Sequence, residues 1–285
     1  MNGRYAPSPT GTLHLGNLRT ALLAWLFARS AGSRFLMRME DLDTGRVRPG
    51  IAEEQLADLA AVGVDWDGEV SYQSQRLDLF ADAIEQLRAA GRVYECFCTR
   101  AEIHEAASAA HGPLPEGAYP GTCLRLTEAE LASKRASGRP PALRVRAGAE
   151  RVAFTDRVHG RQEGVVDDFV IRRNDGAPAY NLAVVVDDAA QGVEEVVRGD
   201  DLLDSTPRQL FVARLLDLPA PQYAHVPLVL GPDGDRLAKR HGGVTLRDVP
   251  AARARAWMAE TLGLDLDPET FAPGLLPREP TIWRG

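Results

Sequence analysis

The stretch Arg4-Tyr-Ala-Pro-Ser-Pro-Thr-Gly-Thr-Leu-His-Leu-Gly16 decides the fold, because it reads as a short strand, a turn rich in proline and glycine, and the start of a helix. The helical pattern continues from Asn17 to Phe27, and His14 stands at the turn. A helix N-terminus offers free N–H groups and the positive end of the helix dipole, which suits a phosphate-bearing ligand. The segment therefore favours a nucleotide site, although many turns of this composition serve only as turns.

A basic segment far along the chain fits the same chemistry. After Val226-Pro-Leu-Val-Leu-Gly231 comes Arg236-Leu-Ala-Lys-Arg240, with three cations in five residues on a predicted loop. Such a cluster can bind a polyphosphate, whereas taken alone it is more often a solvated surface. Together the two segments indicate chemistry on ATP.

Strands and helices alternate along the first hundred residues, which predicts a mostly parallel α/β sheet that binds ligands at the carboxyl ends of its strands. Ser74 is the expected N-cap of the third helix. The sequence lacks the Gly-x-Gly-x-x-Gly fingerprint of dinucleotide sites. The predicted strands are 4–6, 34–39, 94–97, 166–173 and 180–186, and the predicted helices are 17–30, 51–62, 75–90, 206–216 and 249–262.

Residues 99–161 no longer show the regular alternation of strands and helices, and we expect them to form an inserted subdomain. Thr99-Arg-Ala-Glu102 is a capping box that predicts the start of a helix. Segments rich in glycine and proline follow at 111–117 and 137–141. The last twenty or so residues contain four prolines and are expected to wrap the surface.

Composition and charge set broad limits on the function. A chain of 285 residues with 45% hydrophobic and 26% charged residues is ordinary for a globular protein with a sizeable core. The net charge of -7 argues mildly against non-specific coating of nucleic acid. A local basic face would suffice for binding a nucleic acid, and cations gather between Arg236 and Arg255. The sequence has no signal-peptide pattern and no apolar run of about 20 residues, so we expect a cytoplasmic protein with no membrane segment.

All three cysteines, Cys96, Cys98 and Cys123, fall within 28 residues. An odd, clustered set of thiols in such a chain favours a metal over disulfides, and three thiolates are one ligand short of a closed tetrahedral site. The fourth ligand could be His104 or His111, because imidazole is the usual partner of thiolate, or the less usual Tyr119 in Tyr119-Pro-Gly-Thr-Cys123. The alternative is three inert thiols.

Two charged residues at strand ends are candidates for binding an amino acid. Arg4 can present a bidentate fork to a carboxylate, and Glu40 can accept hydrogen bonds from an ammonium group. The simpler alternative is an ion pair between Arg4 and Glu40 across adjacent strands. From the residues alone, Tyr180 reads as a strand aromatic and Arg198 as a surface charge at a helix end.

Several segments resemble the class I aminoacyl-tRNA synthetases of the glutamyl type. Arg4 to Gly16 resembles the family's Pro-Ser-Pro-Thr-Gly and His-x-Gly opening, and Arg236 to Arg240 is similar to its Lys-Met-Ser-Lys-Ser loop, with Ala238 where serine is common. The blocks 178–188 and 197–209 resemble further segments of the family. The resemblance implies an α/β, Rossmann-like nucleotide-binding fold with an inserted zinc-bearing subdomain and a short helical C-terminal region. The catalytic domain would comprise 1–98 and 162–240, with the subdomain at 99–161 and the C-terminal region at 241–285.

The resemblance also implies roles for single residues. Arg4 would grip the side-chain carboxylate of glutamate, Glu40 would bind its amino group, and Arg198 would contact the same ligand. The catalytic pair would be His14, at the phosphates of ATP, and Lys239, at the transition state and the departing pyrophosphate, with Mg²⁺ accompanying ATP. The implied glutamate site comprises Arg4, Tyr5, Ala6, Pro7, Ser8, Glu40, Tyr180 and Arg198. The implied ATP site comprises His14, Gly16, Asn17, Arg236 and Lys239.

A short paralogue within this family carries a Cys-x-Cys…Tyr-x-x-x-Cys zinc site, so the resemblance implies one structural Zn²⁺ held by Cys96, Cys98, Tyr119 and Cys123. Only 45 residues follow Arg240, which is short for an anticodon-binding domain. That paralogue activates glutamate without tRNA and transfers it to queuosine at the wobble position of tRNA(Asp), and we expect the same here from a monomer. The alternatives are a truncated synthetase that charges tRNA(Glu) and a non-catalytic module that binds tRNA or glutamate.

Overall fold

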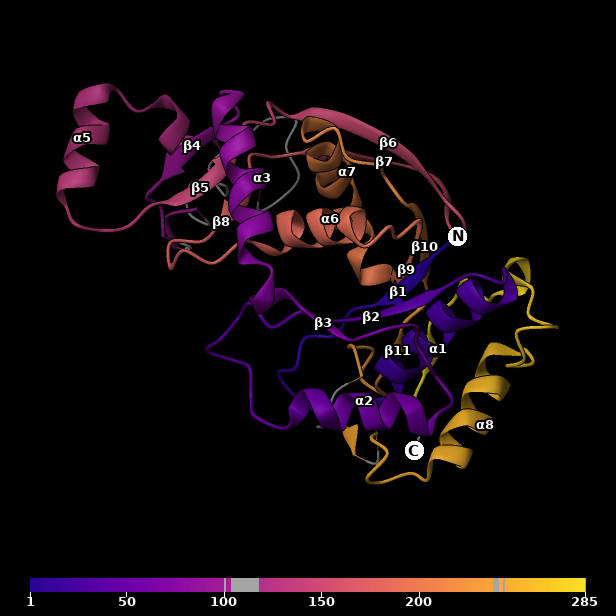
Figure 1. Ribbon diagram of the computed structural model, residues 1–285. Helices are drawn as coiled ribbons and strands as arrows, with labels where there is room; N and C mark the ends of the chain where they lie inside the picture. The colour runs from indigo at the N-terminus through magenta and orange to yellow at the C-terminus, as the bar shows by residue number, and fades with distance from the viewer. Residues whose placement is uncertain (100, 104–117, 238–240, 243, 285) are drawn as a thin grey trace.

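A computed structural model describes residues 1–99, 101–103, 118–237, 241–242 and 244–284 of the chain (Figure 1). Lys239 and Ala238, together with His104 and His111, lie outside these residues. No helix in the described ranges has both the length and the apolar character to cross a membrane.

Parallel strands from both halves of the chain form the centre of the molecule. β1 (Gly3–Tyr5), β2 (Phe35–Met39) and β3 (Ser71–Tyr72) pair in that order, and β9 (Glu195–Gly199) pairs with β10 (Gln222–Val226). The carbonyl of Asn2 accepts from the backbone N–H groups of Glu194 and Glu195 at 2.9 and 3.1 Å, so β1 lies beside β9. The predicted mostly parallel sheet is confirmed for this central part.

Helices cover both sides of these strands (Figure 1). α1 (Leu15–Ser30), α2 (Ile51–Ala61) and α8 (Ala251–Leu262) share one hydrophobic core with β1 and β2. α3 (Leu77–Ala89), α6 (Tyr180–Ala190) and α7 (Thr206–Leu215) share a second core on the other side. The Pro/Gly turn leads from the end of β1 into α1, which packs against β1 and β9 on one side of the strands.

The remaining strands extend this body. β6 (Glu150–Asp156) and β7 (Gly160–Val166) form an antiparallel hairpin whose end pairs with β10. β4 (Val93–Cys96), β5 (Ala142–Val145) and β8 (Val170–Arg172) form an antiparallel sheet beside α5 (Glu128–Ala136). The short 3-10 helices are η1 (Gln73–Gln75), η2 (Thr122–Arg125), η3 (Asp200–Ser205) and η5 (Pro273–Leu275).

The predicted strand at 180–186 is wrong, because this segment forms the first part of helix α6. Its residues from Leu182 to Asp188 are all buried between α3, α7 and β8. An apolar run that is buried on every side shows neither helical nor strand periodicity, and its valines favour a strand prediction. Tertiary packing overrides that local preference.

Smaller differences lie at element ends. Ser74 is not the N-cap of α3, which begins after Arg76; the N–H and hydroxyl of Ser74 donate to Asp41 instead. The predicted strand 166–173 is split between the end of β7 and β8. The C-terminal residues do more than wrap the surface, since β12 (Thr281–Ile282) pairs with β11 (Val229–Leu230) and the side chain of Trp283 is buried. The capping box of Thr99 and Glu102 is confirmed.

Candidate functional site

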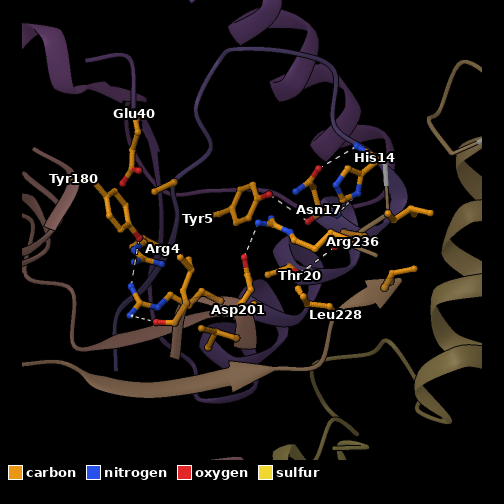
Figure 2. A pocket seen from close by; sticks show the side chains of 18 residues that line it. Arg4, Tyr5, His14, Asn17, Thr20, Glu40, Tyr180, Asp201, Leu228 and Arg236 are labelled. Atoms are coloured by element: carbon orange, nitrogen blue, oxygen red, sulfur yellow. Dashed lines mark hydrogen bonds and ion pairs between the residues drawn. The ribbon is translucent and has the colours of Figure 1, made fainter. Parts of the chain in front are cut away.

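A pocket of about 220 Å³ opens at the carboxyl ends of β1, β2 and β9 (Figure 2). It has two ends: Arg4, Glu40 and Tyr180 cluster at one, and His14 and Arg236 lie at the other. Pro7 and Ser8 line an adjoining open hollow that shares Tyr5 and Glu40 with the pocket. The predicted residues that line the pocket itself are Arg4, Tyr5, Ala6, His14, Gly16, Asn17, Glu40, Tyr180, Arg198 and Arg236.

The turn between β1 and α1 is held from two directions. The side-chain amide of Gln55, on α2, donates to the carbonyls of Ser8 and Gly11 at 3.1 and 2.7 Å. The backbone N–H of Glu40 donates to the carbonyl of Pro7 at 2.9 Å. These contacts fix the conformation of the turn and hold the end of β2 next to it.

Arg4 is buried and pairs with Asp188 rather than with Glu40. Its Nε and Nη2 donate to the two carboxylate oxygens of Asp188, both at 3.3 Å. The alternative of an ion pair between Arg4 and Glu40 is therefore wrong for the described side chains. Within the described ranges Nη1 of Arg4 donates no hydrogen bond, and Arg4 lines the pocket, so this N–H group can donate to a ligand there.

Glu40 is the anion of the amino-acid end. Arg38 Nη2 donates to its Oε1 at 3.2 Å. Burial raises the pKa of Glu40 above its ordinary value, against the opposing effect of Arg38 and Arg4. Because burial penalises the charged carboxylate, a further cation placed next to Glu40 would be bound favourably, and an α-ammonium group meets this need.

Arg198 and Tyr180 line the pocket at the end where Glu40 lies. Arg198 lies on β9 and is buried, so it is not a surface charge at a helix end. Its guanidinium donates to Gln209 at 2.8 Å, to Thr206 at 2.9 Å and, more weakly, to the Tyr180 hydroxyl at 3.5 Å. Tyr180 stands at the first turn of α6 instead of on a strand. Of all these contacts the one to Tyr180 is the longest, so it is the easiest to exchange for a ligand oxygen.

His14 is the N-cap of α1, and its tautomer follows from its contacts. Its Nδ1 accepts from the backbone N–H of Asn17 at 3.2 Å, while Asn17 Oδ1 accepts from the backbone N–H of His14 at 3.2 Å. An accepting Nδ1 carries no proton, so the neutral ring presents an Nε2–H donor. Burial and nearby Arg236 lower the pKa of His14 to about 4. The helix start therefore offers a neutral hydrogen-bond donor suited to a phosphate.

The basic segment begins beside the same helix. Arg236 pairs with Asp201 at 2.7 Å and lines the pocket at the end where His14 lies (Figure 2). The N–H of Leu237 donates to the carbonyl of Val229 at 3.1 Å, which ties this segment to β11. A side chain at Gly16 would place its Cβ 3.0 Å from the His14 ring, so glycine is needed for this close approach.

Four donor atoms converge next to β4. The sulfur atoms of Cys96, Cys98 and Cys123 lie within 4.8 Å of one another, and Cys98 and Cys123 are 3.4 Å apart. The hydroxyl oxygen of Tyr119 is 3.5 Å from the Cys96 sulfur and 3.6 Å from that of Cys98. Tetrahedral Zn²⁺ with Zn–S bonds of about 2.3 Å separates its ligands by roughly 3.7 Å, so the set fits this metal.

Arg144 adds positive charge to this cluster. Its guanidinium carbon lies 3.6 Å above the centre of the Tyr119 ring. Burial raises the pKa of the Tyr119 phenol, so binding as a phenolate depends on the charges of the metal and of Arg144. The histidine alternatives for the fourth ligand, His104 and His111, fall outside the described residues.

Three buried residues next to the pocket were not predicted from sequence: Arg38, Asp188 and His225. Asp188 ends the segment 178–188, which resembles the synthetases, and Arg38 stands two positions before Glu40, but nothing local distinguishes them from surface charges. Their significance follows only from burial, since a buried charge requires a partner.

Comparisons with known proteins agree with this geometry. The family of tRNA synthetases class I (E and Q), catalytic domain, matches residues 1–253. A protein of Nocardia farcinica named glutamyl-Q tRNA(Asp) synthetase is 61% identical over 98% of this chain and 92% of its own length. A protein of the same name from Symbiobacterium thermophilum is 49% identical over 98% of this chain and 94% of its own. The crystal structure of a glutamate tRNA ligase from Elizabethkingia meningosepticum, in complex with its amino acid, is 25% identical with a TM-score of 0.83 over all of this chain and 67% of that one.

Proposed function

The chain belongs to the class I tRNA synthetases of the E and Q type, a family of ligases, and from this premise we propose that it activates L-glutamate with ATP and transfers it to queuosine at the wobble position of tRNA(Asp). The observation that carries the proposal is the two-ended pocket, with arginines and a buried carboxylate at one end and a helix N-terminus with His14 and Arg236 at the other. The proposed acceptor, queuosine in tRNA(Asp), is taken from the names of the similar proteins from Nocardia and Symbiobacterium.

The amino-acid end suits glutamate. Arg4, with Nη1 available, takes the side-chain carboxylate together with Arg198 and the Tyr180 hydroxyl. Glu40 takes the α-ammonium group. Tyr5 and Ala6 line the pocket, and Pro7 and Ser8 line the adjoining hollow, so that this segment directs the α-carboxylate towards His14.

Activation joins two anions, so positioning and charge neutralisation carry the catalysis. An oxygen of the glutamate α-carboxylate attacks the α-phosphorus of ATP, and the bond from that phosphorus to the bridging oxygen breaks. His14 donates through Nε2–H to the phosphates at the start of α1, near Gly16 and Asn17, and Arg236 adds a cation. Lys239 stabilises the transition state and the departing pyrophosphate, and Mg²⁺ bound with ATP would supply further positive charge.

In the second step a hydroxyl of the cyclopentenediol ring of queuosine attacks the carbonyl carbon of the adenylate. The new ester bond forms as the bond to the phosphate oxygen breaks, and the hydroxyl proton is lost as AMP leaves. The acceptor is thus a modified base and not a terminal ribose.

The metal has a structural role in this proposal. Cys96, Cys98, Tyr119 and Cys123 would hold one Zn²⁺ and fix the start of the inserted subdomain, 99–161, to β4. The catalytic domain comprises 1–98 and 162–240, and 241–285 form the C-terminal region. We place the enzyme in the cytoplasm as a monomer, where tRNA and ATP are available.

One measurement tests the function: incorporation of labelled glutamate into tRNA(Asp) with queuosine, tRNA(Asp) without queuosine, and tRNA(Glu), in parallel. Label in the first alone is the expected result. Label in tRNA(Glu) would favour a charging synthetase, the second candidate, because the structurally similar protein is named a glutamate tRNA ligase.

A matched variant separates an enzyme from a binding module. Lys239→Ala should abolish glutamate-dependent exchange between ATP and pyrophosphate, while glutamate still binds. No label in any tRNA, with glutamate affinity intact in both proteins, would favour a non-catalytic module.

A further inference from the structure

We propose that Asp188 is a positioning residue that holds the glutamate pocket in its binding-competent form: it aims Arg4 directly and sets Glu40 through Arg38. The inference rests on the proposed function, since it assigns a role in glutamate binding. Asp188 itself lies behind the pocket and is not among the residues that line it.

Asp188 is shared by two guanidinium groups. Its Oδ1 accepts from Arg4 Nε at 3.3 Å and from Arg38 Nη1 at 2.8 Å, and its Oδ2 accepts from Arg4 Nη2 at 3.3 Å. The exposed fractions are 5% for Arg4, 0% for Arg38 and 4% for Asp188, so solvent hardly screens the three charges. The fork fixes the plane of the Arg4 guanidinium and leaves Nη1 at the ligand side.

Arg38 transmits the same constraint to Glu40. Its Nη1 is held by Asp188 and by Gln191 Oε1 at 2.6 Å, while its Nη2 donates to Glu40 at 3.2 Å. The guanidinium is planar, so fixing Nη1 also fixes the direction in which Nη2 points. Asp188 on α6 therefore fixes the position of Arg4 on β1 and, through Arg38, that of Glu40 at the end of β2.

The charge balance explains why this carboxylate must remain ionised. Although burial disfavours ionisation, Arg4 and Arg38 hold the pKa of Asp188 below its ordinary value. Without that negative charge, Arg4 would lose its ion pair, and Arg38 would keep only Glu40, at 3.2 Å, and Asp187, at 3.7 Å, as counter-ions. Glu40 would then be drawn into the pair and lost to the ammonium group of the substrate.

The adjacent residue offers a matched control. Asp187 is also buried on α6, and it binds Arg76 at 2.5 Å and Gln73 at 2.8 Å, none of which lines the pocket. Its Oδ2 also lies 3.7 Å from Nε of Arg38, the nitrogen that points to neither Asp188 nor Glu40, and it has no ion pair with Arg4. Asp188→Asn and Asp187→Asn therefore remove the same charge from the same helix, with and without contact to Arg4.

The experiment measures KM for glutamate and for ATP in ATP–pyrophosphate exchange, together with thermal unfolding. For Asp188→Asn we expect glutamate KM to rise roughly 10- to 100-fold, as when an outer partner of a bound group is removed, with ATP KM unchanged. Asp187→Asn should change glutamate KM by less than about threefold. Equal effects of the two variants on glutamate KM, or a parallel rise of both KM values in Asp188→Asn, would overturn the inference.

Asp188→Glu decides the matter if the asparagine variant does not fold, because it keeps the charge and displaces it by one methylene. A raised glutamate KM at unchanged ATP KM is again expected, since small misplacements weaken binding strongly. A glutamate KM equal to that of the wild type would count against the role. A wild-type protein without glutamate-dependent exchange would overturn the proposed function and the inference with it, whereas an active wild type with an unaffected Asp188→Glu overturns the inference alone.

Discussion

Nε of Arg198 donates a hydrogen bond of 3.0 Å to Nε2 of His225, and both side chains are buried. The opposite ring nitrogen, Nδ1, lies 2.7 Å from Asp156 Oδ2. Because Nε2 accepts, the neutral ring carries its proton on Nδ1, which donates to Asp156. A chain of contacts thus runs from Asp156 through His225 to an arginine that lines the pocket.

Replacing His225 with leucine would leave the Nε–H of Arg198 buried without an acceptor. We expect the free energy of unfolding to fall by about 1–3 kcal/mol and glutamate KM to rise. His225→Gln offers an oxygen acceptor and should restore part of both. Denaturant unfolding and ATP–pyrophosphate exchange check this, and equal behaviour of the two variants would contradict it.

The low pKa of His14, about 4, predicts its behaviour with pH. In the folded protein the ring should stay neutral down to about pH 5, with the proton on Nε2. An NMR titration of the histidine resonances, assigned with His14→Gln, should show no change for His14 between pH 7.5 and 5.5. A midpoint near 6.5 would contradict the buried, accepting Nδ1.

The same shift has a consequence for stability. The unfolded chain binds a proton at His14 near pH 6.5, whereas the folded chain does so only near 4. Stability from this group is therefore present above about pH 6.5 and is lost as the pH falls towards 4. His225, whose pKa is lowered mainly by burial, acts in the same direction. Unfolding measured from pH 7.5 to 5 should show a smaller loss in His14→Gln than in the wild type.

Metal analysis tests the cysteine cluster. We expect one zinc ion per chain, and its removal by a chelator should lower the temperature of thermal unfolding. Tyr119→Phe should weaken zinc binding, and Tyr119→His should restore it. Glutamate adenylation should persist in Tyr119→Phe, because none of the four donors lines the glutamate pocket. Equal zinc content and affinity in wild type and Tyr119→Phe would remove the tyrosine from the ligand set.

Gly199 is predicted to be needed for space at the ATP end. A Cβ there would lie 2.6 Å from Asp201 Oδ1 and 2.8 Å from Leu228 Cδ2, and both residues line the pocket. Its φ of −61° is open to any residue, so the effect of a side chain is purely steric. Gly199→Ala should raise ATP KM about tenfold or more, since Asp201 pairs with Arg236.

Gly274→Ala is the control for that substitution, because a Cβ at Gly274 meets no atom within 4 Å. Its ATP KM should match that of the wild type. An unchanged ATP KM in Gly199→Ala would mean that Asp201 and Leu228 move aside freely.

The sequence by itself determined the features that are local. The turn before α1, with His14 in it, and the grouping of the three thiols were predicted correctly in their positions. Each depends on residues a few positions apart, or on a residue type with few other uses, so neighbouring sequence carries the information.

Only the tertiary structure decided how the charges of the pocket are paired. The sequence suggested Glu40 as the partner of Arg4, but Arg4 pairs with Asp188, which is 184 positions away. His225 likewise contacts Asp156, which is 69 positions away. The helical structure of α6 also depends on tertiary packing, because a segment that is buried on all sides shows no helical periodicity in its sequence. Buried charges select partners by proximity in the folded core, and that proximity arises when β1, β2, β9 and α6 pack together, which no local pattern records.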